Sequence, residues 1–421
     1  MPAKSLSELV EFARSRSPFY AELYRGLPTR IDRLVELPLV EQTAFWAANK
    51  WPDNRLLTGP LTDAGVYRSG GTTGAPKFSP WTRQEHEDAL AAFGAGIARA
   101  GLRPGHRVAN LFRAGELYGG FLFIEGALHR APVDNVRLGF GAAPDDFVAE
   151  LIDSFGVDVL AGEPMKLSAV AEHLLRQGRT ADGVELLLFG GDLLFDDLRP
   201  VLSRAFPKAA LASIGYASVD AGLVAGPVPG EDVRVHEAFP HCTVVELVDE
   251  DTGEPITTAG VPGRVVVTNL FRTLLPILRY PTGDRGEWTD PRRGRFRLVG
   301  RSLEGARVGT ITMPVEDLRA ALLAADPERL ICGMQLVERR RDGRDELVVR
   351  LGHLEPPPAD GLAARNERLA LAAALARPGF LEEVADGAIH PIAIEWVPRA
   401  ELATNPRTGK LRQVLDERPH T

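Results

Sequence analysis

The chain has 421 residues, of which 49 are Lys or Arg and 57 are Asp or Glu, so its formal net charge is −8. The hydrophobic fraction of 44% and the charged fraction of 25% are ordinary for a globular protein, and the length predicts about two or three domains. The acidic balance, without a basic stripe, argues against nucleic-acid binding. No apolar run approaches the roughly 18 residues of a membrane span, and the N-terminus lacks a signal-peptide pattern. The two cysteines, Cys242 and Cys332, suit buried thiols better than a disulfide framework or zinc site. We therefore expect a cytoplasmic protein.

The first half of the chain predicts alternating helices and strands. Residues 5–24 read as one helix, with apolar side chains on one side. Further helices are predicted from Arg83 onward and over residues 116–128 and 144–155, and strands over 107–112, 157–161 and 184–189. The last two strands are almost continuously apolar, which is typical of strands covered on both faces. Alternation of this kind predicts an α/β sheet with parallel strands.

The pattern changes after about residue 225. Strand-like segments at 243–248, 264–270 and 296–299, separated by turn residues, predict a small β-rich subdomain. The final section contains helical patterns at 314–325 and about 366–376 and a hairpin that turns at Asp342-Gly343. The expected fold is a large N-terminal α/β domain over residues 1–300, with its β-rich subdomain, and a small α+β C-terminal domain over residues 301–421.

One loop combines several glycines with hydroxyl side chains and a lysine. Residues 67–77 read Tyr-Arg-Ser-Gly-Gly-Thr-Thr-Gly-Ala-Pro-Lys. Bare backbone N–H groups, hydroxyls and one cation are suited to holding phosphate oxygens. A Walker-type loop does not fit, because Pro76 precedes Lys77 and Phe78 follows it. A flexible surface turn is the alternative explanation for the glycines.

Three further segments carry charged groups on glycine-containing turns. Tyr280–Asp284 places an acid on a tight Thr-Gly turn, Gly300-Arg301 lies at the expected domain boundary, and Asn405–Lys410 places a lysine just before an expected last helix. Each alone has an ordinary explanation: a solvated turn acid, a linker arginine, or a loop at a helix start. Their order and spacing together favour a common site.

These motifs resemble those of the adenylate-forming superfamily, which contains acyl-CoA synthetases, peptide-synthetase adenylation domains and luciferases. The strongest resemblance is to phenylacetate–CoA ligases, and it covers nearly the whole chain. Ser17–Tyr20 resembles the family's "SPFY" helix end, Gly190–Asp192 its "GGE" turn, and Thr252–Pro255 its hairpin. The family's glycine-rich helix is matched loosely by Gly115, Gly119, Gly120 and Gly126.

The resemblance implies roles for individual residues. The ATP phosphates would be held by Ser69, Gly70, Gly71, Thr72, Thr73, Gly74 and the catalytic Lys77. The adenine pocket would be formed by Gly190, Gly191, Asp192 and the stacking ring of Tyr216. Asp284 would bind the ribose, Arg301 the ribose or a phosphate, and Asp220 the Mg²⁺ ion. The catalytic Lys410 would bridge the substrate carboxylate and the α-phosphate, carried by a C-terminal domain that rotates at Gly300–Ser302.

The chain also departs from the family's pattern. The Tyr-Gly-x-Thr/Ser-Glu motif reads Tyr216-Ala217-Ser218-Val219-Asp220, so the acid is one methylene shorter and only Ser218 offers a displaced hydroxyl. Asp192 likewise replaces a glutamate. Ser302–Glu304 differs from the usual hinge, and the stretch 307–314 lacks the usual asparagine. The last two departures bear mainly on the second half-reaction.

The substrate and acceptor follow from the resemblance less directly than adenylation does. Phe121, Phe123, Gly215 and Gly222 are candidate lining positions for the acid, with plain core packing as the alternative. The leading hypothesis is an ATP- and Mg²⁺-dependent ligase that forms an acyl-adenylate, releases pyrophosphate and passes the acyl group to CoA, with an aryl or arylacetic acid as substrate. An adenylating enzyme that serves an amine or a carrier-protein thiol in secondary metabolism is the first alternative. A non-catalytic nucleotide-binding relative is the second. Homodimers are common among the ligases that the chain resembles.

Overall fold

The computed structural model describes residues 4–69, 77–194, 196–301, 305–309, 311–377, 379–406 and 408–418. The chain forms two compact units. The first comprises Met1–Leu167, Ala181–Leu194 and Lys208–Ser302, and the second comprises Ser168–Thr180, Phe195–Pro207 and Leu303–Thr421. The second unit thus includes two short segments of the N-terminal half, and the division at residue 300 stays a prediction.

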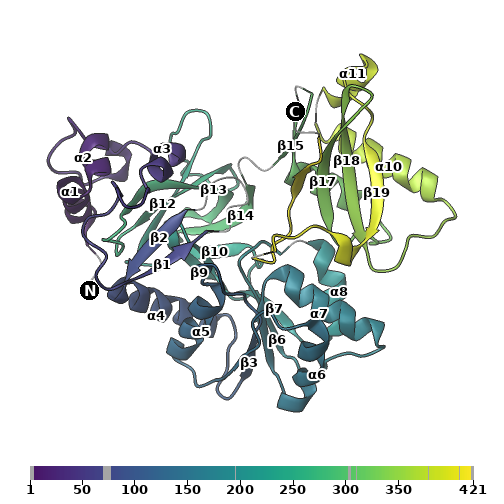
Figure 1. Cartoon of the computed structure of the whole chain (residues 1–421), viewed down its shortest axis with the longest axis horizontal. Coiled ribbons are helices and arrows are strands. Elements are labelled where there is room, and N and C mark those ends of the chain that lie inside the picture. Colours follow the sequence, from purple (N-terminus) through teal and green to yellow (C-terminus); the bar gives the residue numbers. More distant parts are fainter. Residues whose placement is uncertain are drawn as a thin grey trace. The chain divides into compact units, whose positions relative to one another are not determined.

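A five-stranded sheet of parallel strands lies in the first unit (Figure 1). Its order is β4 (Val136–Gly139), β3 (Arg107–Asn110), β5 (Val159–Gly162), β6 (Leu186–Phe189) and β7 (Ala210–Ser213). Every residue of β5 and β6 is buried. The helices that alternate with these strands include α4 (Arg83–Arg99), α5 (Gly120–Arg130) and α6 (Asp145–Phe155). The expected α/β class with parallel strands is therefore confirmed.

The helix expected over 116–128 begins later than predicted. Glu116 and Leu117 have φ of 47° and 64°, values that a right-handed helix excludes. They lie in a turn closed by the bridge between Gly115 and Tyr118. The turn delays α5 until Gly120.

The second sheet of the first unit has seven strands, and its paired strands are antiparallel. Its order is β11 (Thr243–Val248), β12 (Pro262–Asn269), β13 (Ile277–Asp290), β14 (Arg295–Arg301), β10 (Val235–Ala238), β9 (Gly222–Pro227) and β8 (Tyr216–Ser218). A hairpin of β1 (Ala64–Arg68) and β2 (Phe78–Thr82) is separate from it. The β-rich part expected after residue 225 is this sheet, which begins with β8.

The N-terminal helices α1 (Leu6–Arg16), α2 (Pro18–Leu23) and α3 (Gln42–Ala47) share one buried core with this sheet (Figure 1). The buried hydroxyl of Tyr20 donates a hydrogen bond of 2.8 Å to the carbonyl of Pro276. A single helix over 5–24 was therefore wrong. Ser17 is extended, with ψ 119°, because the residue before a proline avoids helical geometry, and Pro18 then starts a new helix.

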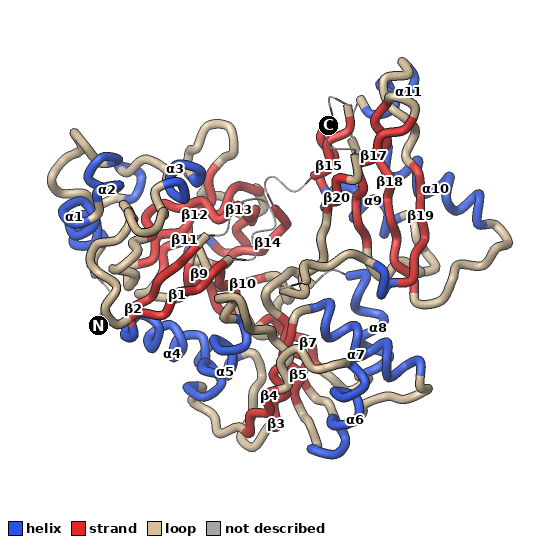
Figure 2. Tube along the Cα trace, in the orientation of Figure 1, coloured by secondary structure: helices blue, strands red, loops and turns tan. Residues whose placement is uncertain are grey.

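The second unit contains the mixed sheet β19 (Ala393–Pro398), β18 (Arg344–His353), β17 (Met334–Arg341) and β20 (Val414–Asp416), and the hairpin of β15 (Gly305–Val308) and β16 (Ile311–Pro314). In Figure 2, β17, β18 and β19 run side by side. The helices α9 (Val315–Ala324), α10 (Leu362–Leu375) and α11 (Phe380–Ala385) complete its C-terminal section. Of the remaining helices, α8 (Arg199–Ala205) belongs to this unit, and α7 (Pro164–Arg176) crosses from the first into the second.

The last helix expected after Lys410 is wrong, because the segment forms β20 and pairs in parallel with β17. Leu411, Gln413 and Leu415 are buried and alternate with exposed or half-buried neighbours. A two-residue period suits a strand, whereas a helix would bury positions three and four apart.

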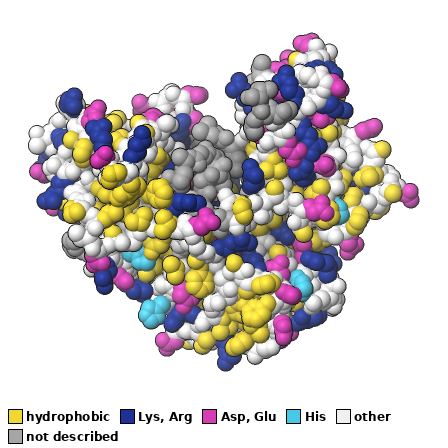
Figure 3. Space-filling model, in the orientation of Figure 1, with side chains coloured by type: hydrophobic (Ala, Val, Ile, Leu, Met, Phe, Trp, Pro, Cys, Tyr) yellow, Lys and Arg dark blue, Asp and Glu magenta, His cyan; other side chains and the backbone are white. Residues whose placement is uncertain are grey.

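Charged side chains of both signs are interspersed over the face shown in Figure 3. Among the described residues, no helix is both long and apolar enough to cross a membrane.

Candidate active site

The β1–β2 hairpin holds the two ends of the predicted phosphate loop together. Arg68 and Phe78 are the last paired residues of the hairpin. The backbone N–H of Ser69 donates to the carbonyl of Lys77 at 3.0 Å, and the N–H of Lys77 donates to the Ser69 hydroxyl at 3.3 Å. The candidate residues between these ends, which are Gly70, Gly71, Thr72, Thr73 and Gly74, lie outside the described residues.

Lys77 points to a polar cluster that joins distant parts of the chain. Its Nζ lies 2.8 Å from Asp220 Oδ2 and 3.4 Å from the Tyr280 hydroxyl. The Tyr280 hydroxyl donates to Asp220 at 3.0 Å and accepts hydrogen bonds from Trp46 Nε1 at 2.8 Å and Gln42 Nε2 at 3.1 Å. Lys77 also lies 5.4 Å from the centre of the Trp46 ring, within the range of a cation–π contact. The lysine is therefore held by a carboxylate, a phenol and an indole.

The surroundings of Asp220 keep its carboxylate ionised. Burial alone would raise the pKa of Asp220, but the charge and hydrogen bond of Lys77, with further bonds from Ser218 and Tyr280, hold the pKa below its ordinary value. Ser218 Oγ also accepts from the backbone N–H of Ala221 at 3.0 Å. Burial and the nearby Asp220 charge raise the pKa of Tyr280 well above its ordinary value, so the phenol stays protonated and can donate.

The donor set at Asp220 suits a magnesium ion that also binds substrate phosphates. No group of three or more His, Cys, Asp or Glu side chains placed to hold a metal occurs among the described residues. Mg²⁺ usually takes one or two protein carboxylates and completes its octahedron with water and phosphate oxygens. Asp220 supplies one such carboxylate, so the residues fit the ion that the family resemblance implies.

A second polar pair lies on the same sheet. The Tyr216 hydroxyl donates to Asp284 Oδ2 at 2.5 Å, and the backbone N–H of Asp284 donates to Thr282 Oγ1 at 3.1 Å. Asp284 and Arg301 are direct partners between β13 and β14, although the Arg301 side chain is outside what the structure describes. The structure thus brings together the backbones of both predicted ribose-binding residues. The tight turn expected at 280–284 is wrong: these residues lie inside the long strand β13, where Gly283 has φ 87°.

The predicted adenine turn follows β6 at the carboxyl end of the parallel sheet, where α/β proteins commonly bind ligands. A Cβ on Gly190 would lie 2.3 Å from Ile214 Cγ2, so this position has no room for a larger residue. Gly191 has φ 77°, a conformation that glycine adopts readily. The Asp192 carboxylate accepts from the backbone N–H of Leu193 at 2.9 Å. Ile214, two residues before Tyr216, links the turn to the tyrosine strand.

Three of the four candidate acid-lining positions are connected by aromatic side chains. Phe123 and Phe93 lie 5.1 Å apart between ring centres, and a Cβ on Gly215 would lie 3.0 Å from Phe93. A Cβ on Gly222 would similarly lie 3.4 Å from Trp81. Phe121, also on α5, lies instead beside the end of β4, where a Cβ on Gly139 would meet its ring at 3.1 Å.

The His86 ring lies between the rings of Trp81 and Phe123 and connects them. Its ring centre lies 6.3 Å from that of Phe123 and 6.5 Å from that of Trp81. We call Trp81, His86, Phe123 and Phe93 the aromatic row. Sequence reasoning assigned no role to Trp81, His86 or Phe93. The helical spacing of His86 and Phe93 on α4 was visible, but it carried no signal for a site.

Lys410 belongs to the second unit. The backbone N–H of Asn405 donates to the carbonyl of Lys410 at 2.8 Å, and Gly409 donates back to Asn405 at 2.8 Å. A bridge between Thr404 and Leu411 closes the loop. Lys410 is therefore presented on a hydrogen-bonded loop, and its contact with the reacting atoms stays a prediction.

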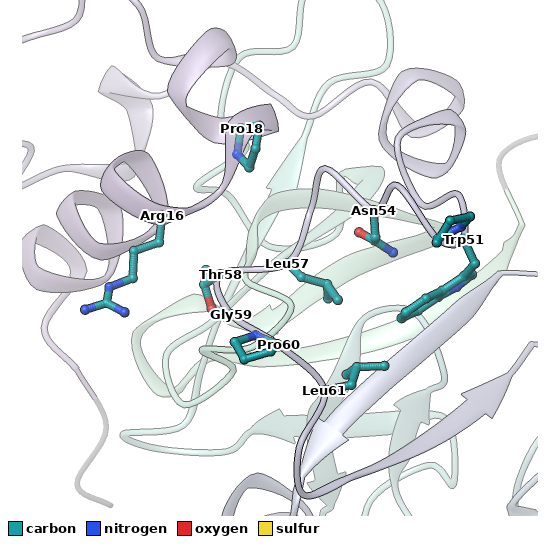
Figure 4. A pocket seen from close by; sticks show the side chains of 10 residues that line it. Arg16, Pro18, Trp51, Asn54, Leu57, Thr58, Gly59, Pro60 and Leu61 are labelled. Carbon is teal, nitrogen blue, oxygen red and sulfur yellow. The ribbon is translucent and has the colours of Figure 1, made fainter.

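A cavity of about 440 Å³ lies among the N-terminal segments of the first unit (Figure 4). Arg16, Trp51, Leu57 and Leu61 contribute to its lining. None of the residues predicted to bind ATP, metal or acid lines this cavity. We therefore place the candidate active site at the hairpin and the strands β8, β13 and β14.

Comparison with known proteins shows what the whole chain is similar to. A phenylacetate–coenzyme A ligase of Thermus thermophilus is 25% identical over 441 residues, which cover 98% of this chain and 95% of that protein. A phenylacetate–coenzyme A ligase of Pseudomonas putida is 28% identical over 328 residues, which cover 73% of this chain and 69% of that protein. Among solved structures, a 2-hydroxyisobutyryl-CoA ligase in its postadenylation state matches with a TM-score of 0.75 at 18% identity, covering 98% of this chain and 88% of that one. No protein-family model matches the chain.

The fold is therefore that of a solved acyl-CoA ligase. Over nearly its whole length the chain is similar to a phenylacetate–coenzyme A ligase.

Proposed function

We propose that the protein is an AMP-forming acid–CoA ligase that activates a small carboxylic acid with ATP. The observation that carries the proposal is the meeting of Lys77 with Asp220 in the same unit that pairs Tyr216 with Asp284. One pair lies at the base of a loop suited to phosphates, and the other carries the groups expected to bind a nucleoside. An aryl or arylacetic acid is the proposed substrate, by similarity to the phenylacetate ligases.

The reaction has two halves. In the first, a carboxylate oxygen attacks the α-phosphorus of ATP, the bond to the β-phosphate breaks, and pyrophosphate leaves. In the second, the CoA sulfur attacks the acyl carbonyl and AMP leaves. Both reactants of the first half are anions, so catalysis depends on positive groups aimed at the charge that develops.

The residues divide this work. Lys77 and the N–H groups near Ser69 orient the β- and γ-phosphates, while Tyr216 and Asp284 hold the nucleoside and so fix the α-phosphate in line with the acid. A bound Mg²⁺ held by Asp220 would supply further positive charge. We propose that Lys410, carried by a mobile C-terminal domain of residues 301–421, neutralises the reacting carboxylate and α-phosphate. Loss of one such charged donor typically costs roughly 2.7–4 kcal/mol, or about 10²–10³ in rate.

ATP–pyrophosphate exchange over a panel of aryl, arylacetic and fatty acids tests the first half-reaction. We expect exchange that depends on one of the aryl or arylacetic acids. Lys410→Ala should abolish exchange and leave ATP binding, measured by calorimetry, largely intact. Equal loss of both would show that the lysine has been given the wrong role.

The acceptor needs its own measurement. Loss of free CoA thiol and appearance of AMP, each dependent on the acid, would support the ligase. Strong exchange without CoA consumption would favour an amine or a carrier-protein thiol as acceptor instead. If no acid supports exchange, the protein would be a non-catalytic nucleotide-binding relative. A cytoplasmic location and a homodimer remain parts of the proposal, and gel filtration with light scattering tests the second.

A further inference from the structure

Two polar side chains lie within the aromatic surroundings of the candidate acid-binding region. The Tyr67 hydroxyl and His86 Nε2 are 3.0 Å apart, and their rings stack with centres 5.6 Å apart and planes inclined by 22°. Both side chains are half-buried. A Cβ on Gly119 would lie 2.4 Å from the Tyr67 ring, so the backbone approaches this ring closely and helps to fix it.

This pair lies beside the elements that carry the proposed chemistry. Tyr67 is on β1, two residues before Ser69, where the predicted phosphate loop begins. His86 is part of the aromatic row, which reaches Gly215 through Phe93, and Gly215 directly precedes Tyr216. An acid in line with the α-phosphate must lie between the phosphate loop and the nucleoside-binding strand, and the pair and the row connect a residue just before that loop with a residue just before that strand.

The Tyr67–His86 pair has unused hydrogen-bonding capacity whichever ring nitrogen carries the proton. A phenol offers one donor and two acceptor positions, and a neutral imidazole offers one donor and one acceptor. Their single mutual hydrogen bond consumes one donor and one acceptor. One N–H or O–H and at least one lone pair are left over, and no other hydrogen bond to either side chain is found among the described residues. Burial lowers the pKa of His86, which favours the neutral ring.

We infer that the Tyr67–His86 pair reads a hydroxyl or amino substituent on an aromatic acid, so that the preferred substrate is a hydroxy- or amino-aryl acid and not the unsubstituted parent. This inference rests on the proposed function. A hydroxyl group both donates and accepts, and an amino group donates, so each can use the capacity that the pair leaves open. An unsubstituted ring would cover the pair and leave a donor and an acceptor without partners. Sites built to hydrogen-bond a substituent discriminate strongly against analogues that lack it.

The test compares acids that differ by one group: phenylacetate and benzoate against their ortho-, meta- and para-hydroxy and amino derivatives. The measured quantity is kcat/KM for acid-dependent ATP–pyrophosphate exchange. We expect at least one substituted acid to exceed its parent by roughly tenfold or more. Tyr67→Phe keeps the stacked ring and removes the hydroxyl, so it should lower this ratio about tenfold, mainly by slowing the substituted acid. His86→Phe should have the same effect.

Tyr24→Phe is a matched control. The Tyr24 hydroxyl is buried in the N-terminal core and has no hydrogen-bond partner among the described residues, so its removal should leave the substrate ratio unchanged. Wild-type enzyme that uses parent and substituted acids equally well would overturn the inference and leave the proposed function intact. The same holds if the Tyr67 and His86 variants slow both acids by one factor. If none of the tested acids supports exchange, the proposed function is overturned together with the inference.

Discussion

The pairing of Lys77 with Asp220 makes a prediction that separates stability from catalysis. The two side chains are 27% and 13% exposed, so water screens their charges only in part. Lys77→Met removes the cation and leaves the Asp220 carboxylate largely buried without its counter-charge. Breaking a buried pair on one side typically costs roughly 3–5 kcal/mol. Because Lys77 keeps some exposure, we expect a loss of about 2 kcal/mol in the free energy of unfolding.

The double variant Lys77→Met, Asp220→Asn provides the internal control. Removing the carboxylate charge should restore most of the lost stability, since no buried ion is then left alone. Exchange activity should behave differently. It should fall about 10²–10³-fold in Lys77→Met, as expected for one charged donor lost from the transition state. It should not return in the double variant, because the carboxylate proposed to hold Mg²⁺ is gone as well.

Urea unfolding followed by tryptophan fluorescence gives the free energies of unfolding of the wild type, Lys77→Met and the double variant. Pyrophosphate exchange gives their rates. The reasoning would be refuted if the double variant were as unstable as Lys77→Met alone, because the two groups would then be uncoupled. Recovery of exchange in the double variant would also refute it, since Lys77 would then act only by balancing Asp220.

Three further predictions concern neighbouring parts of the first unit. Burial lowers the pKa of His236 to about 4 from 6.5, so the unfolded state binds more protons than the folded state between these pH values. The free energy of unfolding should therefore fall by roughly 3 kcal/mol as the pH drops through this window. His236→Gln should remove this pH dependence in urea titrations at pH 4–7. Gly190→Ala should cost about 1–3 kcal/mol of stability through overpacking. Gly183→Ala should be close to neutral, because a Cβ at Gly183 meets nothing within 4 Å. Equal melting temperatures for the two variants would contradict the packing argument. Tyr216→Phe removes the 2.5 Å hydrogen bond to Asp284. It should raise the KM for ATP by about tenfold, as expected for the loss of a hydrogen bond to a charged group, and change kcat less. An unchanged KM would exclude this tyrosine from nucleotide binding.

The sequence predicted best those features that depend on neighbours along the chain. The acidic first turn of α6 and its end at Gly156, where φ is 57°, follow from helix-capping rules that need only a few adjacent residues. The apolar runs of β5 and β6 predicted buried parallel strands for the same reason. The phosphate-loop hypothesis likewise rested on composition within a single stretch, and the structure adds the closure between Ser69 and Lys77.

Features that depend on distant pairing could not be predicted in this way. The Tyr280 hydroxyl joins Gln42, Trp46, Lys77 and Asp220, which lie between 60 and 238 positions away in the sequence. Their meeting depends on how helix α3, the β1–β2 hairpin and the seven-stranded sheet pack together. Tyr280 heads the motif that ends at Asp284, so its position was noticed, but nothing local indicated that its hydroxyl would hold the lysine and its carboxylate.

The charges of the described site residues are consistent with the role proposed for Lys410 in adenylation. Among the described side chains assigned to phosphate, metal and ribose, Lys77 is balanced by Asp220, and Asp284 adds a further negative charge. This set is therefore net negative before an anionic triphosphate and an anionic acid arrive. A bound Mg²⁺ would offset part of that charge at the phosphates, but the attacking carboxylate and the α-phosphate would still repel each other. Lys410, on its hydrogen-bonded glycine loop, is the cation we expect at these two reacting groups, in addition to Arg301, which is predicted to reach the ribose or a phosphate.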